Sequence, residues 1–330
     1  MNTALEIGLH AAVIAVDSGT PLYLAVPGKN PRGNTLDGLP FGPYQPGEHR
    51  TLDTGLRRWV EEQTRLSLGY VEQLYTFGDM GRMDGQSLGA ESFVSVGYLA
   101  LVRKPETAAD TQSLQWGDWY SHFPWEDWRA GPPPLLTEQL MPALASWVSA
   151  SPGERSNASG LDRQVRFRLA FGCELPKSNI PTIIAWDEER VLERYELMYE
   201  AGLVDEAVFD GQVEKLALSP SPGKPMLHDH RRILATAIAR LRAKLKYRPV
   251  VFELLPESFT LTELQQTVET LSGRKLHKQN FRRMVEKAEL VEPTGATASR
   301  TGGRPAAYFR FRKAVLRERP APGLRIGSRG

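Results

Sequence analysis

The order of short segments near the C-terminus is the feature that most limits how this chain can fold. The segment "TLTELQQTVETLSG" is typical of a helix, because Thr260 and Glu263 form a capping box at its start and Gly273 can end it. "KLHKQNFRRMVEKAEL" predicts a second helix after a tight turn, and "VEPTG" and "AYFRFR" flank a polar, Gly-rich tip. Helix, turn, helix and hairpin in this order predict a winged helix-turn-helix.

The second of these helices is amphipathic, and its polar face suits nucleic acid. Its apolar residues recur at helical spacing and are Phe281, Met284, Val285 and Ala288. The opposite face carries Gln279 and Arg283, flanked by Lys275, Arg282 and Glu286. Arg reads guanine and Gln reads adenine in the major groove of DNA. At the tip of the hairpin, Arg300 and Arg304 are placed to reach phosphates or a minor groove.

Charge is divided unevenly along the chain. Residues 1–222 hold 18 Lys and Arg against 30 Asp and Glu, whereas residues 223–330 hold 23 against 9. Basic side chains that neutralise phosphates release counterions, so we expect the C-terminal part to bind a polyanion. The positive charge by itself could also belong to a solvated surface that binds nothing. The helix-turn-helix pattern is the observation that favours DNA as the polyanion.

The N-terminal part has the mixed strands and helices of an α+β or α/β sandwich. "LEIGLHAAVIAV" and "PLYLAV" predict a hairpin around "DSGT", and "ESFVSVGYLALV" predicts another strand. Polar and Pro-rich stretches at "SPGERSNASG" and "SPSPGKP" indicate two boundaries. We therefore expect a ligand-sensing domain over residues 1–150, a linker and helical insert over 151–222, and a DNA-binding domain over 223–330.

The stretch "GPYQPGEHRTLDTGLRRWVEEQT", Gly42 to Thr64, resembles the pyrophosphate-cleaving loop and helix of Nudix hydrolases. Their pattern is G-x5-E-x7-R-E-U-x-E-E-x-G-U, where U is a bulky apolar residue. Gly42 and Glu48 have the required spacing, and Glu61 and Glu62 match the later acidic pair. Such glutamates share a helix face and hold a divalent metal, which neutralises a diphosphate and activates water. A solvated acidic helix end is the alternative interpretation of the pair.

Three positions depart from this pattern. Eight residues rather than seven separate Glu48 from Arg57, Arg58 stands where the first metal-binding glutamate belongs, and Thr64 replaces the glycine. A cation placed among anionic ligands opposes Mg²⁺, so we expect the site to lose metal affinity and catalytic rate together. The sequence therefore predicts a degenerate Nudix box with no catalytic residue and no metal site.

Longer motifs resemble the NrtR-type family of Nudix-related transcriptional regulators. They are "EQLYTFGDMGR", "HDHRRILATAIARLRAKLKYRPVVFELLPESFTLTELQ", "NFRRMVEKAELVEPTG" and "GGRPAAYFRFR". The segments "LDRQVRFRLAFG" and "WDEERVLERYELMYEAGLVDEA" resemble the NadQ subgroup more closely. The resemblance implies an α+β multidomain fold, in which an N-terminal Nudix-like α/β/α sandwich is followed by a C-terminal winged helix-turn-helix.

The resemblance also implies a function and a set of site residues. The expected function is that of a homodimeric repressor of NAD biosynthesis genes. It would bind a palindromic operator in double-stranded DNA, need no cofactor, and respond to an effector nucleotide of the ATP, NAD or ADP-ribose type. The residues expected to contact DNA are Lys275, Lys278, Gln279, Asn280, Arg282, Arg283, Arg300 and Arg304. The residues expected near the nucleotide are Lys29, Arg57, Glu61, Glu62 and Arg82, the last in the loop "FGDMGR".

Two other functions stay open at this point. One is an active Nudix nucleotide pyrophosphohydrolase with a basic accessory domain. The other is an adaptor that binds nucleic acid, RNA included, without reading its sequence.

The remaining features predict ordinary structural roles. No run of 18 or more apolar residues could span a bilayer, and "MNTALEIGLH" is unlike a secretory signal, so we expect a cytoplasmic, nucleoid-associated protein with no membrane partner. For His228 and His230 we expect a helix cap or a polar surface role rather than a metal site. The tryptophans between residues 116 and 128 are expected to pack the edge of the sandwich rather than to stack on a base.

Overall fold

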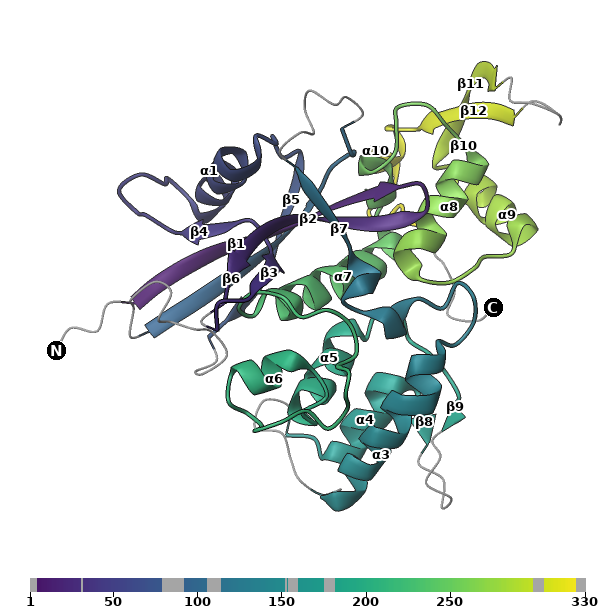
Figure 1. The fold of residues 1–330 in the computed structure, drawn as a ribbon. Helices are drawn as coiled ribbons and strands as arrows, with labels where there is room; N and C mark the ends of the chain where they lie inside the picture. The colour runs from purple at the N-terminus through teal and green to yellow at the C-terminus, as the bar shows by residue number, and fades with distance from the viewer. Residues whose placement is uncertain are drawn as a thin grey trace.

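The structure, a computed structural model, describes residues 5–30, 32–78, 92–105, 114–151, 153, 160–174, 182–298 and 306–324 (Figure 1). Its strands are β1 (Leu5–Asp17), β2 (Thr20–Lys29), β3 (Thr35–Gly38), β4 (Phe41–Pro43), β5 (Tyr70–Phe77), β6 (Ser92–Leu101), β7 (Gln115–Asp118), β8 (Cys173–Glu174), β9 (Thr182–Ile183), β10 (Phe259–Thr260), β11 (Val291–Ala298) and β12 (Ala306–Phe311). Its α-helices are α1 (Leu52–Thr64), α3 (Met141–Ala150), α4 (Arg163–Phe171), α5 (Val191–Glu200), α6 (Asp205–Phe209), α7 (His230–Tyr247), α8 (Leu261–Ser272), α9 (Lys278–Ala288) and α10 (Val315–Glu318). Shorter helical segments are η2 (Trp119–Ser121), η3 (Pro124–Glu126), η4 (Leu135–Leu140) and η5 (Val250–Glu253).

Seven of the described strands form one mixed sheet. The order β3-β2-β1-β6-β5 is extended by β4, which pairs with β1, and by β7, which pairs with β2. Strands β1 and β6 are parallel, with Leu9 opposite Val96, and the other pairs are antiparallel. Asp17 pairs with Thr20 across the β1–β2 turn, which confirms the predicted hairpin.

Helices cover both faces of this sheet. Leu9 and Val13 of β1 pack in one cluster with Leu56 of α1, whereas Ala12 and Ile14 pack in a second cluster with residues of α7. Figure 1 shows α1 and α7 on opposite sides of the sheet. A strand covered on both faces needs apolar residues on both, which explains why β1 is nearly continuously apolar. The predicted α/β/α sandwich is confirmed.

Helix α7 packs on the sheet, although the sequence predicts it to belong to the DNA-binding part. It contacts β1, β5 and β6, and α5 of the insert packs against it as well. Much of its charge is internal, since Arg242 is 1% exposed and Lys244 pairs with Glu72 of β5 at 2.6 Å. The boundary at residue 223 stays a prediction, and we propose that the sensor domain instead extends to Tyr247.

The winged helix has the predicted elements. Thr260 Oγ1 accepts a hydrogen bond from the Glu263 N–H at 3.2 Å, and Glu263 Oε2 accepts one from the Thr260 N–H at 2.7 Å, so the capping box is confirmed. Phe281 and Val285 of α9 are buried, as the apolar stripe predicts. Strand β12 lies between β10 and β11 and completes the hairpin of the wing.

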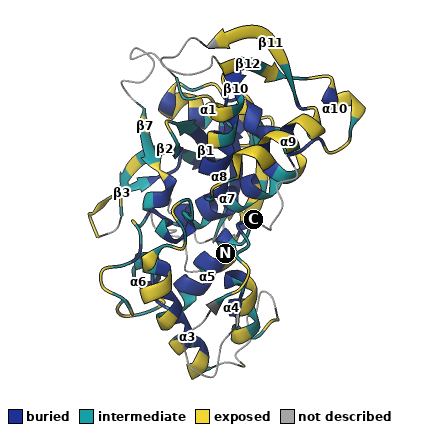
Figure 2. Cartoon of the chain, turned by 90° about the vertical axis from the view of Figure 1, so that its right-hand side faces the viewer, coloured by how far each residue is buried: buried dark blue, intermediate teal, exposed yellow. Residues whose placement is uncertain are grey.

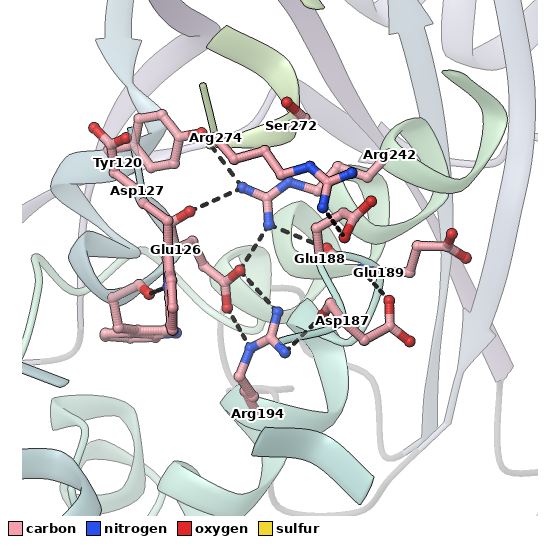
Figure 3. A network of polar contacts seen from close by, with 12 residues as sticks. Tyr120, Glu126, Asp127, Asp187, Glu188, Glu189, Arg194, Arg242, Ser272 and Arg274 are labelled. Atoms are coloured by element: carbon pink, nitrogen blue, oxygen red, sulfur yellow. Dashed lines mark hydrogen bonds and ion pairs between the residues drawn. The ribbon is translucent and has the colours of Figure 1, made fainter. Parts of the chain in front are cut away.

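A buried ion-pair cluster joins three parts of the chain (Figure 3). Glu126 of η3 accepts two hydrogen bonds from Arg194 of α5, at 2.6 and 2.9 Å, and one from Arg242 of α7 at 2.7 Å. All three residues are at most 1% exposed. Two guanidinium groups taken out of water need a compensating charge, and Glu126 supplies it.

Replacing Glu126 with Gln removes the negative charge between two buried cations. We expect Glu126→Gln to lower the free energy of unfolding by about 3–5 kcal/mol. The neighbouring Asp127→Asn is the matched control, because the ion pair of Asp127 with Arg129 is 31% and 24% exposed. Its cost should be about 0–1 kcal/mol. Urea unfolding measures both, and equal costs would contradict the assignment.

Two buried histidines join α7 to the sheet. His230 Nδ1 accepts a hydrogen bond from the Leu39 N–H at 3.0 Å, so its Nε2–H donates to His10 Nδ1 at 2.9 Å. Burial is the main cause that lowers the pKa of His10 to about 3, and it lowers the pKa of His230 well below 6.5. Since His230 is 0% exposed, the cap or polar surface role expected for it is wrong.

These histidines should make stability depend on pH. Below about pH 6.5 the unfolded chain protonates both rings, whereas the folded chain protonates them only near their lowered pKa values. Stability is therefore fully present above that pH and falls as the pH drops toward 3, by up to about 1.4 kcal/mol per pH unit for each ring. His10→Gln keeps an acceptor for His230 and should give a shallower dependence in urea unfolding. If His10→Gln leaves the pH dependence of the free energy of unfolding unchanged, the two histidines are not its cause.

Candidate nucleotide pocket and nucleic-acid interface

Arg58 lies between two acidic side chains of the Nudix-like motif. Its Nη1 is 2.7 Å from Glu48 Oε2, and its Nε is 2.7 Å from Glu62 Oε1. Hydrogen bonds to Glu62 and to Glu48 raise the pKa of Arg58 above its usual value. The guanidinium group thus stands where paired carboxylates would share a cation. Within the part of the chain that the structure describes, no group of three or more His, Cys, Asp or Glu is placed to hold a metal ion.

The loop that brings Glu48 to α1 is held by close packing. A Cβ on Gly42 would lie 2.3 Å from the Trp59 ring, so only glycine fits there. Trp59 Nε1 also donates to the Pro43 carbonyl at 2.9 Å. The glycine of the motif therefore sets the approach of loop and helix, independently of any catalysis.

The other residues expected near a nucleotide have separate environments. Arg57 donates to Asp53 Oδ2 at 2.9 Å and to the Leu68 carbonyl, so it holds the chain that follows α1. Glu61 and Glu62 are exposed on α1, whereas Lys29 is exposed at the end of β2. Arg82 lies outside the described residues. The structure therefore groups Arg57, Glu61 and Glu62 on one helix and leaves Lys29 on another element.

Among the described residues, two of the cavities lie outside this motif. One of about 70 Å³, next to Arg32 and Phe209, is far below the roughly 300–1,000 Å³ of ligand pockets. The other, of about 670 Å³, is a groove between the sheet and the wing. Its charged lining residues are Arg103, Arg310, Arg312, Lys313, Glu253, Glu257 and Glu292. Because acids nearly match bases there, the groove does not favour an anion.

Helix α9 presents the predicted polar face to solvent (Figure 2). Lys278, Gln279, Asn280, Arg282 and Arg283 are all exposed. Arg282 and Arg283 are both exposed, so their guanidinium groups are accessible to a ligand. Such a face can read base edges in a major groove.

The turn before α9 is held by Glu269 of α8. Its carboxylate accepts hydrogen bonds from Gln265 Nε2 and from the Leu276 N–H, both at 2.9 Å, and from Lys275 Nζ at 3.0 Å. Burial opposes ionisation of Glu269, but these hydrogen bonds lower its pKa. Lys275 is thus exposed but already paired. Arg300 and Arg304 lie outside the described residues.

The sequence gives no signal for the residues that hold α8 in place. Tyr120, Glu126 and Arg242 come from distant segments, and only folding brings them together. Tyr120 and Glu126 lie in the aromatic loop of residues 119–128, where Trp119 and Trp125 have the predicted packing role, since both are 0% exposed.

The fold and the exposed basic helix define a Nudix-like domain joined to a winged-helix DNA-binding domain. Residues 251–311 match the family model described as "NrtR DNA-binding winged helix domain". The chain is 41% identical over 83 residues to the "ADPR responsive transcriptional repressor NtrR" of Acinetobacter baylyi. That match covers 25% of this chain and only about a third, 33%, of the curated relative.

Solved structures give the same fold. Shewanella oneidensis NrtR complexed with a 27mer DNA has a TM-score of 0.53 at 20% identity, covering 94% of this chain and 95% of that one. A MutT/nudix family protein from Enterococcus faecalis has a TM-score of 0.50 at 15% identity, covering 94% and 88%. The chain therefore carries an NrtR-type winged helix on the fold of NrtR, and the expected resemblance is confirmed. The closer likeness to the NadQ subgroup stays a prediction.

The position of Arg58 leads to a test of metal binding. Arg58→Glu places an acid where the Nudix pattern has one and frees Glu48 and Glu62, so the variant should bind Mn²⁺ while the wild type does not. Arg65→Glu is the matched control, because it makes the same charge change at the exposed end of α1. Calorimetric titration with Mn²⁺ measures the affinity. If the wild type binds Mn²⁺ as tightly as Arg58→Glu does, Arg58 does not oppose metal binding and the interpretation is wrong.

Proposed function

We propose that the chain is a transcriptional repressor whose winged helix binds operator DNA and whose Nudix-like domain binds a nucleotide effector. The observation that carries the proposal is the exposed Arg and amide face of α9 on an NrtR-type winged helix. The names of its relatives support it, since one is an ADPR-responsive repressor and another was solved with DNA.

Among the expected effectors, we propose ADP-ribose ahead of ATP and NAD. The reason is the ADPR response in the name of the Acinetobacter baylyi relative. We propose that the nucleotide contacts Glu61 on the outer face of α1 and Arg82, and that no cofactor is required. A sensor that cleaved its ligand would report its concentration poorly, and Arg58 between Glu48 and Glu62 opposes the metal that cleavage needs. We therefore propose that the Nudix-like domain binds without useful hydrolysis.

The proposed acting form is a homodimer on a palindromic operator near NAD biosynthesis genes. A dimer reads two half-sites about 34 Å apart, so a small change in the angle between its two α9 helices weakens binding. An effector that binds one dimer geometry better than the other would shift the population in this way. We propose a cytoplasmic, nucleoid-associated location. No described helix is long and apolar enough to cross a membrane.

Selection from a random DNA duplex library by the full-length protein tests the proposal. We expect enrichment of a two-fold symmetric sequence. Its affinity, measured by fluorescence anisotropy, should change at least about fivefold on addition of ADP-ribose, a coupling of typical size. A selection that yields no sequence, or a duplex whose affinity is unmoved by ADP-ribose, ATP and NAD alike, would remove the proposal.

The main alternative is an active Nudix pyrophosphohydrolase. Incubation of the protein with ADP-ribose or NADH and Mg²⁺ should then release AMP. We expect no AMP above the uncatalysed rate, because a cation occupies the position of a metal-binding acid.

Base readout by α9 can be separated from simple charge attraction. Arg283→Ala should cost about 1–3 kcal/mol of discrimination at one base position of the selected duplex. Lys287→Ala removes an exposed charge from the last turn of the same helix and should leave discrimination unchanged. Anisotropy with single-base variants of the duplex measures both. If Arg283→Ala weakens every sequence equally, α9 does not read sequence, and the adaptor function is favoured.

A further inference from the structure

The end of α8 is fastened to residues outside the winged helix. Two of its backbone carbonyls and that of Gly273, the residue that ends the helix, accept hydrogen bonds from residues outside the winged helix. These bonds run from Tyr120 Oη to Thr270 (2.9 Å), from Arg242 Nε to Leu271 (3.0 Å) and from the Trp128 N–H to Gly273 (2.6 Å). The last carbonyls of a helix have no partner within it, so they are free to accept bonds of this kind. The turn that leads into α9 is therefore anchored through its backbone.

The contact is close and dry. Thr270 and Ser272 are 1% and 5% exposed. Gly273 has a φ of +75°, and a Cβ added to it would lie 2.4 Å from the Glu126 carbonyl oxygen. The helix-turn-helix turn thus lies directly against the loop of residues 119–128, so a shift of that loop acts on the turn without an intervening side chain.

Arg242 is itself held from several sides (Figure 3). Its guanidinium group donates to Glu126 Oε2 at 2.7 Å, to Tyr120 Oη at 3.3 Å and to the Glu188 carbonyl at 3.1 Å. Glu126 is in turn bound by Arg194 of the insert. A group fixed on several sides transmits displacement instead of absorbing it. We name Tyr120, Glu126, Trp128 and Arg242 the clamp.

The loop is also tied to the sheet of the Nudix-like domain. It continues β7, which pairs with β2 through Leu22 and Asp118. Within the loop, His122 Nε2 lies 2.7 Å from Tyr23 Oη of β2. Strand β2 pairs in turn with β3, the strand that precedes the Nudix-like loop. A contiguous set of bonded elements therefore runs from the proposed ligand domain to the turn before α9.

We propose that this clamp positions α9 relative to the Nudix-like domain and transmits effector binding to operator affinity. The inference rests on the proposed function and extends it by naming residues that contact neither DNA nor effector. Two ligands are coupled only through an element whose state both of them change. The clamp is such an element, because it joins the turn of the DNA-binding domain to the sheet of the sensor domain.

The test compares two buried tyrosines. Tyr120→Phe removes the bonds to Thr270 and Arg242 but keeps the ring, whereas Tyr199→Phe removes a bond to Asp210 in the insert. Both tyrosines are 6% exposed, so they are matched in burial. For each full-length variant, anisotropy gives the affinity for the selected duplex with and without ADP-ribose, and the ratio of the two is the coupling. Thermal unfolding checks that each variant is folded.

We expect Tyr120→Phe to reduce the coupling about fivefold toward unity, as the loss of these two hydrogen bonds allows. Tyr199→Phe should keep the wild-type coupling, and affinity for ADP-ribose without DNA should be the same in all three proteins. A folded Tyr120→Phe with wild-type coupling overturns the clamp and leaves the proposed function intact. A wild type with no coupling instead counts against the effector part of the proposed function.

Hydrogen exchange of the wild type gives a second readout if Tyr120→Phe does not fold. The Trp128 amide donates to Gly273, so its exchange rate reports the clamp directly. We expect this rate to change when the selected duplex binds and again when ADP-ribose is added. If the exchange rate of the Trp128 amide changes with neither ligand, the inference is overturned, even if operator binding responds to ADP-ribose.

Discussion

The carboxylate of Glu126 lies between the buried guanidinium groups of Arg194 and Arg242, and much of the architecture depends on that arrangement. A charge moved out of water costs several kcal/mol, about 3–5 when its partner is missing, so each member holds the other two in place. The three residues belong to η3, α5 and α7, three elements that are far apart in the sequence. Arg242 also bonds the end of α8, and the cluster therefore reaches the DNA-binding domain.

One consequence is that the parts expected from the sequence do not pack as separate bodies. A single apolar cluster runs from Ala12 of the sheet through Ile238 of α7 to Phe281 of α9. A further buried arginine, Arg231, bonds Glu206 of α6 at 3.1 Å and so ties the insert to the start of α7. Rigid packing of this extent suits a protein in which binding at one site alters another.

Arg58 and Arg242 show how surroundings change the role of the same side chain. Arg58 binds the carboxylates of Glu48 and Glu62, whereas Arg242 binds the carboxylate of Glu126 and several backbone carbonyls. Arg58 lies on an exposed helix face with 49% of its side chain accessible. Exposed ion pairs contribute little to stability, so the significance that we propose for Arg58 is chemical: its cation would oppose the binding of a metal ion by Glu48 and Glu62. Arg242 is buried, and its significance is mechanical because it fixes the positions of two helices.

The sequence alone determined the features that local rules control. The capping box of Thr260 and Glu263, the glycine that ends α8 and the apolar stripe of α9 act within a few residues, so the winged helix could be predicted in detail. The same holds for the β1–β2 hairpin and for the departures at Arg58. Only the tertiary structure decided where α7 packs, because a count of its basic residues cannot tell surface charge from the buried Arg231 and Arg242. It also decided that His230 is part of the core and that the clamp exists, since hydrogen bonds such as that from Tyr120 to Thr270 join residues 150 positions apart and leave no periodic pattern in either segment.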